Sequence, residues 1–93
     1  MLNQVVIIGR IQKIIEDEDK NMILKLKVEN NSNGELFDIK LQNNIAKSLS
    51  KSCIENDIVG IKGKLECIND KMMVHADRVT FLSKRRENDE IER

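Results

Sequence analysis

The sequence predicts a small all-β domain with one short helix, and three features of the chain lead to this fold class. The chain has 93 residues, which is enough for one small domain. Most of it consists of Val-, Ile- and Leu-rich segments in which apolar and polar residues alternate, separated by turns rich in Asn, Asp and Gly. One segment instead places its apolar residues three and four positions apart, which is typical of an amphipathic helix.

Three strands are predicted in the first half of the chain, over residues 2–15, 21–30 and 35–42. The first is longer than an average strand, and Gly9 within it predicts a bend or bulge where one strand serves two parts of a sheet. The second and third alternate cleanly, so each turns one face toward a core. The residues expected to face inward are Leu24, Leu26, Val28, Phe37, Ile39 and Leu41.

A helix and two further strands are predicted in the second half. The helix spans residues 43–54, with Asn43 or Asn44 as its N-cap. Strands over 58–68 and 71–83 follow, joined by a tight turn. Five strands with a helix between the third and the fourth, β-β-β-α-β-β, is the layout of an OB-fold, a small Greek-key barrel.

The charges are balanced overall but unevenly distributed. Lys and Arg number 16 and so do Asp and Glu, yet residues 87–93 (ENDEIER) contain four acids and one base. We expect an OB-fold domain over residues 1–84 and a charged, disordered tail over 85–93, which has too little apolar surface to pack. A mildly basic body with an acidic tail suits a nucleic-acid binder and equally suits an ordinary solvated surface. The acidic loop at 16–19 (EDED) could repel DNA from one rim of the barrel.

Glycines and lysines in the segment DIVGIKGKLECIND, residues 57–70, suggest a phosphate-binding loop at first sight. The spacing of Gly60 and Gly63 does not fit a Walker A loop, and Leu65 stands where a hydroxyl would be needed. We interpret both glycines as positions that let a barrel strand coil sharply. On this interpretation Lys62 and Lys64 point to the same outer face.

Catalytic and metal chemistry have no candidate residues. Cys53 and Cys67 lie 14 positions apart without CxxC spacing, and His75 is the only histidine. No acid–base pair is evident, so we predict a protein that is not an enzyme and uses no cofactor or metal. The chain lacks a signal-peptide pattern and an apolar run of membrane-spanning length, so a cytoplasmic protein with reduced thiols, not bound to a membrane, is expected.

Four segments resemble the bacterial single-stranded DNA-binding proteins, in the same order and spacing. MLNQVVIIGRI resembles the opening strand of that family, IAKSL its helix, ENDIVGIKGKLE its turn into the fourth strand, and HADRVTFLS its last strand. The similarity covers about residues 1–83. It implies an OB-fold, binding of single-stranded DNA without catalysis, and assembly into homodimers or homotetramers.

The chain departs from the family in its aromatic residues. Members of the family stack bases on exposed aromatic rings, whereas this chain has no Trp or Tyr. Both of its phenylalanines, Phe37 and Phe81, are expected in the core. The family's C-terminal tail for partner proteins ends in apolar residues, and here the chain ends in Arg93.

Binding would therefore depend on cations that contact the nucleic-acid backbone with little sequence preference. The candidate nucleic-acid-binding residues are Arg10, Lys25, Lys27, Lys40, Lys62 and Lys64. The first functional hypothesis is a single-stranded DNA-binding protein acting in DNA replication, recombination or mobile-element transfer, with replication or recombination proteins as further partners. The second is an OB-fold protein–protein adaptor of the primosomal type with weak or no DNA binding.

Overall fold

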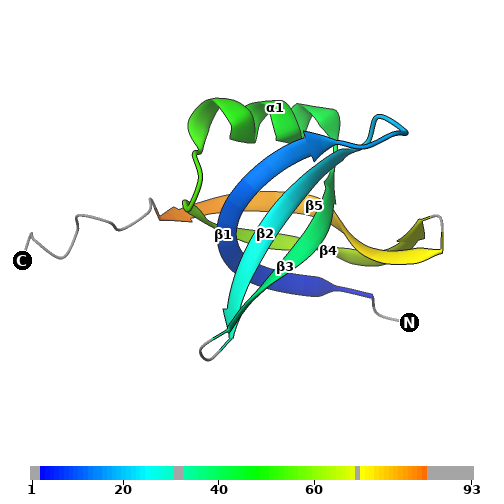
Figure 1. Ribbon diagram of the computed structural model, residues 1–93, viewed down its shortest axis with the longest axis horizontal. Coiled ribbons are helices and arrows are strands. Elements are labelled where there is room, and N and C mark those ends of the chain that lie inside the picture. Colours follow the sequence, from blue (N-terminus) through cyan, green and yellow to red (C-terminus); the bar gives the residue numbers. More distant parts are fainter. Residues whose placement is uncertain (1–2, 31–32, 69, 84–93) are drawn as a thin grey trace, which may run out of the picture.

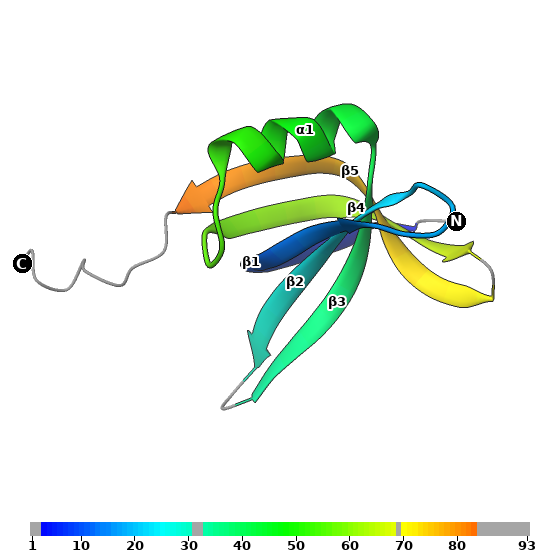
Figure 2. The same ribbon diagram turned by 45° about the horizontal axis from the view of Figure 1, so that its top comes forward.

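Five β-strands close into a barrel, and one helix lies across an end of it (Figure 1 and Figure 2). The computed structural model describes residues 3–30, 33–68 and 70–83. The elements are β1 (Val5–Glu16), β2 (Met22–Asn30), β3 (Asn33–Leu41), α1 (Asn43–Ser52), β4 (Ile58–Ile68) and β5 (Lys71–Ser83). The strands follow one another around the barrel as β1-β2-β3-β5-β4. The predicted OB-fold and its element order are confirmed; the predicted tail, residues 85–93, lies outside the described residues.

β1 serves two parts of the barrel, as its length predicted. Val5–Arg10 pairs with β4, and the same strand from Arg10 to Glu16 pairs with β2. Gly9 lies where the pairing partner of β1 changes from β4 to β2. A Cβ atom there would come within 2.6 Å of the carbonyl oxygen of Lys27. The residue is glycine because the strands cross too closely for a side chain. The register shift of β1 lies further on, between Ile11 and Lys13.

β4 and β5 form a long antiparallel hairpin whose register shifts between Lys62 and Gly63. A Cβ atom on Gly63 would collide with the backbone carbonyl oxygen of His75, so this position needs a glycine. A Cβ atom on Gly60 would meet the side chains of Leu82 and Ile8 at ordinary distances of 3.5 and 4.0 Å. The interpretation as a coiling position therefore holds for Gly63, whereas Gly60 has no steric need to be glycine.

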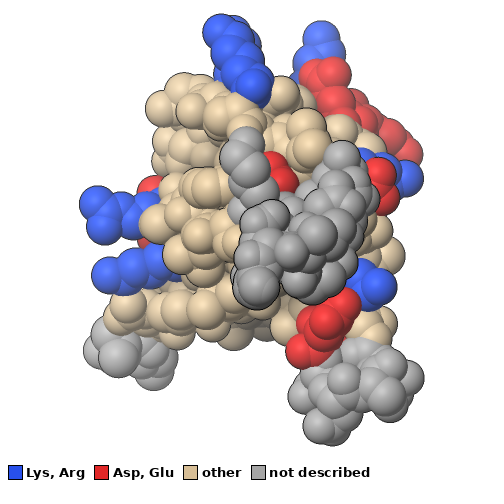
Figure 3. Space-filling model, turned by 90° about the vertical axis from the view of Figure 1, so that its left-hand side faces the viewer, with Lys and Arg blue, Asp and Glu red and all other residues tan. Residues whose placement is uncertain are grey.

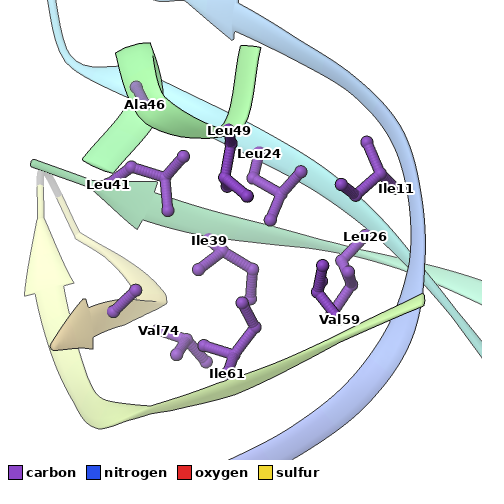
Figure 4. Close-up of a cluster of buried hydrophobic side chains, with 11 residues drawn as sticks. Ile11, Leu24, Leu26, Ile39, Leu41, Ala46, Leu49, Val59, Ile61 and Val74 are labelled. Atoms are coloured by element: carbon purple, nitrogen blue, oxygen red, sulfur yellow. The ribbon is translucent and has the colours of Figure 1, made fainter. Parts of the chain in front are cut away.

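The core fills the barrel beneath α1 (Figure 4). Leu24, Leu26, Ile39, Val59 and Ile61 are fully buried, and each contributes about 1.5–3 kcal/mol through the apolar area removed from water. Ala46 and Leu49 of α1 close the end of the barrel above them (Figure 4).

Four local expectations were wrong. Phe37 is 39% exposed and Phe81 is 47% exposed, although both were expected in the core. Each follows the inward alternation of its strand, but Phe37 belongs to the β2–β3 hairpin, which extends past the barrel (Figure 1), and Phe81 lies near the end of β5. The N-cap of α1 is Gln42, which makes no side-chain capping hydrogen bond, and the helix ends at Ser52.

Candidate nucleic-acid interface

Four cations lie in two rows on the outer face of β1 and β2. Arg10 lies directly opposite Lys27, and the next row places Lys13 opposite Lys25. Their alternation with the buried residues Ile11, Leu24 and Leu26 directs all four side chains away from the core. We call Arg10, Lys13, Lys25 and Lys27 the basic stripe.

Two like-charged pairs directly opposite each other on adjacent strands destabilise a sheet. Each such pair costs a few tenths of a kcal/mol or more relative to a neutral pair. Lys13 and Lys27 make no ion pair with a described side chain that would offset this cost. A polyanion laid across the stripe would convert this repulsion into attraction.

Two of the four cations already have a partner in the structure. The ammonium of Lys25 lies 2.7 Å from a carboxylate oxygen of Asp38 on β3. The guanidinium of Arg10 donates a hydrogen bond of 3.1 Å to the backbone carbonyl of Asn56, in the connection between α1 and β4. An exposed ion pair contributes at most about 1 kcal/mol, so a phosphate can compete for Lys25. Arg10 has a structural contact in addition to any contact with a ligand.

Lys40 and Lys64 form a second group around His75, and Lys40 also lies opposite Ile23 of β2, next to the Lys25–Asp38 pair. Both lie in register with His75, Lys40 from β3 and Lys64 from β4. The Nδ1 of His75 lies 2.9 Å from a carboxylate oxygen of Glu66. The hydrogen bond from His75 holds the pKa of Glu66 below its ordinary value, and His75, Lys40 and Lys64 add electrostatic attraction. The carboxylate of Glu66 thus offsets part of the charge of this group.

Lys62 is separate from both groups. It is exposed and lies opposite Arg78 of β5, with Val6 as its neighbour on β1. The six predicted residues are therefore not brought together in one place. The structure groups Arg10, Lys25 and Lys27 with Lys13, and it pairs Lys62 with Arg78; neither Lys13 nor Arg78 was predicted from the sequence.

Charge on the end of the barrel where β5 terminates is divided in the same way (Figure 3). Lys and Arg side chains project from separate places around the rim of this end, and Asp and Glu side chains lie between some of them. On this end, the Lys and Arg side chains of the described residues form small clusters rather than one continuous patch.

An acidic groove lies between the β1–β2 loop and the β4–β5 hairpin. It measures about 370 Å³ and contains the apolar side chains of Ile15, Ile23 and Met73. Its charged lining residues are Asp17, Glu18, Asp19, Lys25, Asp38 and Lys71. In OB-folds these two loops and the face of strands two and three bind oligonucleotides. In this groove four carboxylates outnumber two ammonium groups, so the groove repels a nucleic-acid backbone. The EDED segment predicted such repulsion at one rim of the barrel.

Asp17 holds the loop that carries these acids. Its carboxylate accepts hydrogen bonds from the backbone amides of Asn21 at 2.8 Å and Asp19 at 2.9 Å. The hydrogen bond from the Asn21 amide is the main reason that the pKa of Asp17 lies below its ordinary value of 3.8. The ionised carboxylate therefore stabilises the folded loop.

Replacing Asp17 with alanine should destabilise the protein at pH 7 and have little effect at low pH. Because the pKa of Asp17 is lower in the folded state, its stabilisation is complete above the unfolded value and is lost as the pH falls through the folded value. Urea unfolding of both proteins at pH 7 and at a pH below the folded-state pKa of Asp17, which itself lies under 3.8, measures this. An equal difference in stability at both pH values would show that the carboxylate charge is not involved.

Phe37 is exposed on the β2–β3 hairpin, on the opposite face from the basic stripe. We expect the substitution Phe37→Leu to change affinity for single-stranded DNA by less than about threefold, because binding by backbone charge needs no ring. A base stacked on Phe37 would be worth roughly 1–3 kcal/mol, or about 5- to 150-fold. Fluorescence anisotropy with a labelled oligonucleotide distinguishes the two, and a tenfold loss would identify Phe37 as a stacking platform.

Three further features of the described residues concern metal sites, membrane-spanning helices and disulfides. Within residues 3–30, 33–68 and 70–83, no group of three or more His, Cys, Asp and Glu side chains could hold a metal ion. No helix of the described chain is long and apolar enough to span a membrane. Cys53 is half-buried and Cys67 exposed, and neither is in a disulfide.

Comparisons with known proteins find a likeness to this chain in the fold of solved structures. No family model matches the chain, and no curated protein matches its sequence. Among solved structures, the mitochondrial single-stranded DNA-binding protein of S. cerevisiae is similar over 90% of this chain and 97% of its own, with a TM-score of 0.75 and 11% identity.

Two bacterial proteins have the same architecture. The dimeric N-terminal domain of PriB from Thermoanaerobacter tencongensis is similar over 88% of this chain and 98% of its own, with a TM-score of 0.66 and 17% identity. A small single-stranded DNA-binding protein from Streptomyces coelicolor is similar over 88% and 94%, with a TM-score of 0.66 and 14% identity. At these identities the likeness shows the shared OB-fold.

Proposed function

We propose that this protein binds single-stranded DNA without catalysis, mainly through contacts between the basic stripe and the nucleic-acid backbone. The observation that carries the proposal is the pair of like-charged rows, Arg10 with Lys27 and Lys13 with Lys25, on an OB-fold barrel. The fold is shared with single-stranded DNA-binding proteins of a mitochondrion and of a bacterium. The roles that follow are protection and organisation of single strands in replication, recombination or mobile-element transfer.

The acidic groove restricts where a strand can lie. Proceeding from the β1–β2 loop along the two strands, the loop acids come first, then Ile15 opposite Ile23, and then the two rows of cations. A strand that crosses β1 and β2 at the basic stripe keeps its phosphates away from the loop carboxylates. Lys40, Lys62 and Lys64 are proposed as secondary contacts, because they lie on other strands and Glu66 offsets part of the charge beside Lys40 and Lys64.

Titration of a labelled oligo-dT at two salt concentrations tests this function. Four phosphate contacts give a slope of log affinity against log salt of about −2.8, since each contact on a single strand contributes about −0.7. Affinity should then fall about fiftyfold between 50 and 200 mM salt. Oligo-dA of the same length should bind within about threefold of oligo-dT, because backbone charge is independent of the base. An absence of binding at 50 mM would refute the proposal.

We also propose a homodimer or homotetramer formed through β1. The pairing of Val5–Gly9 within the described strands involves β4 alone, so this half of β1 has an edge available to a second copy. Val6 is 68% exposed and Ile8 57% exposed on the outer face of the same segment, beside Leu82. Sedimentation of the full chain gives the subunit number, and Ile8→Glu should shift it toward the monomer; a wild-type monomer at all concentrations would contradict this proposal.

A protein–protein adaptor of the primosomal type is the second candidate. The similarity of the barrel to the PriB domain and the lack of aromatic residues on the outer face of the described strands favour it. Charge reversal of Lys25, Lys27 and Lys40 separates the two functions. Loss of DNA retention supports direct binding, and unchanged retention supports the adaptor.

A further inference from the structure

A second groove runs between α1 and the β1–β2 loop, on the side of this loop that faces the helix. It measures about 640 Å³, within the range of ligand-binding pockets, and none of the basic-stripe residues lines it. Met22 and Ala46 form apolar parts of its lining. The other lining residues are Glu16, Lys20, Asn43, Lys47, Ser50 and Lys51.

α1 turns one stripe of its surface toward this groove. Asn43, Ala46, Lys47, Ser50 and Lys51 follow the spacing i, i+3, i+4, i+7, i+8, which places them on one face of a helix. The stripe is about 12 Å long, at 1.5 Å per residue. That length accommodates roughly four residues of an extended peptide, at about 3.3 Å each.

Three lysines line the groove against one carboxylate, that of Glu16. No ion pair joins Lys20, Lys47 or Lys51 to another side chain of the described chain. Lys47 and Lys51 are four apart on α1, and like charges at this spacing destabilise a helix by a few tenths of a kcal/mol. The destabilisation at Lys51 is offset by its favourable position in the last turn of the helix, whereas Lys47 has no such compensation.

Lys20 is held toward the groove by its backbone. Its φ is 66°, a left-handed conformation that a residue with a Cβ atom rarely adopts. The backbone amide of Lys20 donates to the carbonyl of Asp17 at 3.0 Å, while the carboxylate of Asp17 binds the amides of Asp19 and Asn21. The loop thus fixes a strained residue whose side chain lines the groove.

We propose that this groove binds an acidic peptide segment of a partner protein, with one apolar side chain on Met22 and Ala46 and flanking carboxylates on the lysines. Charge complementarity carries the assignment, since the lining has a net charge of +2 from three lysines and one glutamate. Among the described residues no aromatic ring lines the groove, so it offers no stacking surface for a base. This site goes beyond the proposed DNA binding and does not depend on it.

The probe is an acetylated hexapeptide of four glutamates and two leucines, titrated into the isotope-labelled full-length protein and followed by NMR. We expect amide shifts confined to α1 and the β1–β2 loop. Two control peptides have glutamine in place of glutamate or serine in place of leucine. Each should bind at least about fivefold more weakly, because each removes one of the two kinds of contact. Equal binding of all three peptides would overturn the proposal.

Charge reversal then locates the site. Lys47→Glu with Lys51→Glu should weaken the acidic peptide at least about tenfold and leave oligo-dT binding within about twofold. Ser50→Glu, at an exposed position in the groove, should also weaken the peptide, which guards against a misfolded double variant. The matched reversal Lys13→Glu with Lys27→Glu should leave the peptide unaffected. If the groove variants lose oligo-dT instead, the groove is a nucleic-acid site and the proposal fails.

The chain's own acidic segment, residues 87–93, is the competing occupant. Replacing its four acids with the corresponding amides should change peptide affinity by less than about twofold if a partner is the natural ligand. A rise of more than about threefold would mean that this segment fills the groove, and would overturn the assignment to a partner protein.

Discussion

Replacing Lys13 and Lys27 together with glutamate should weaken binding of single-stranded DNA on the order of a hundredfold at 50 mM salt. Each phosphate contact makes affinity at 50 mM salt about eightfold higher than at 1 M salt, since the slope per contact is about −0.7. Loss of the contact removes this factor. Two lost contacts give about sixtyfold, and two added carboxylates repel the backbone further. Anisotropy titration of a labelled oligo-dT measures the loss.

The same double variant should be more stable than the wild type. Each glutamate would lie opposite a cation, Lys25 in one row and Arg10 in the other, so two repulsive cross-strand pairs become attractive. A gain of about 0.2–1 kcal/mol per pair predicts a rise in Tm of a few degrees. Weaker binding with a higher Tm excludes unfolding as the cause.

A charge-matched control separates the basic stripe from net charge. Lys47→Glu with Lys51→Glu changes the total charge of the protein by the same amount on α1. If this variant loses as much DNA affinity as the β1–β2 variant, then binding is not specific to the stripe and depends either on overall charge or on the groove beside α1.

Replacing Gly63 with alanine should cause the largest loss of stability of any single methyl addition at the glycines of β4. The new methyl group would collide with the backbone carbonyl of His75, and neither strand of this hairpin can move without breaking its ladder. Overpacking typically costs 1–3 kcal/mol, and a clash with backbone lies at the upper end, about 3 kcal/mol. Thermal unfolding should show a Tm lower by roughly 12–24 °C.

Gly60→Ala is the matched control within the same strand. Its methyl group would lie 3.5 Å from Leu82, an ordinary contact, and alanine restricts the unfolded chain more than glycine does. The expected change in Tm is therefore near zero or slightly positive. Equal losses at the two positions would mean that strand propensity, and not the close approach of β5, determines which residues are tolerated.

The fold could be predicted from the sequence because its determinants are local. Strict alternation in residues 21–30 and 35–42, and the change of period in 43–54, give the strands and the helix directly. The exposure of Phe37 could not be predicted in this way. Alternation gives the direction of a side chain, whereas burial depends on how far the barrel extends along each strand, and the β2–β3 hairpin extends beyond it.

The candidate site was predicted only in part, for a similar reason. Lys13 was missed because the register shift between Ile11 and Lys13 turns it to the outer face, opposite Lys25. Simple alternation from Arg10 would have turned it inward. Lys40, Lys62 and Lys64 were grouped with the others by their strand positions, but in the barrel Lys40 and Lys64 flank His75, whereas Lys62 lies opposite Arg78. The acidic rim at the β1–β2 loop could be predicted from the sequence alone. Its acids line the groove between that loop and the β4–β5 hairpin.

The salt dependence of DNA affinity is the most direct test of binding by the basic stripe. We predict a slope of log affinity against log salt of about −2.8 for the wild type and about −1.4 for the neutral double variant Lys13→Gln with Lys27→Gln, because two of four phosphate contacts are removed. An unchanged slope in the variant would contradict a role for the stripe.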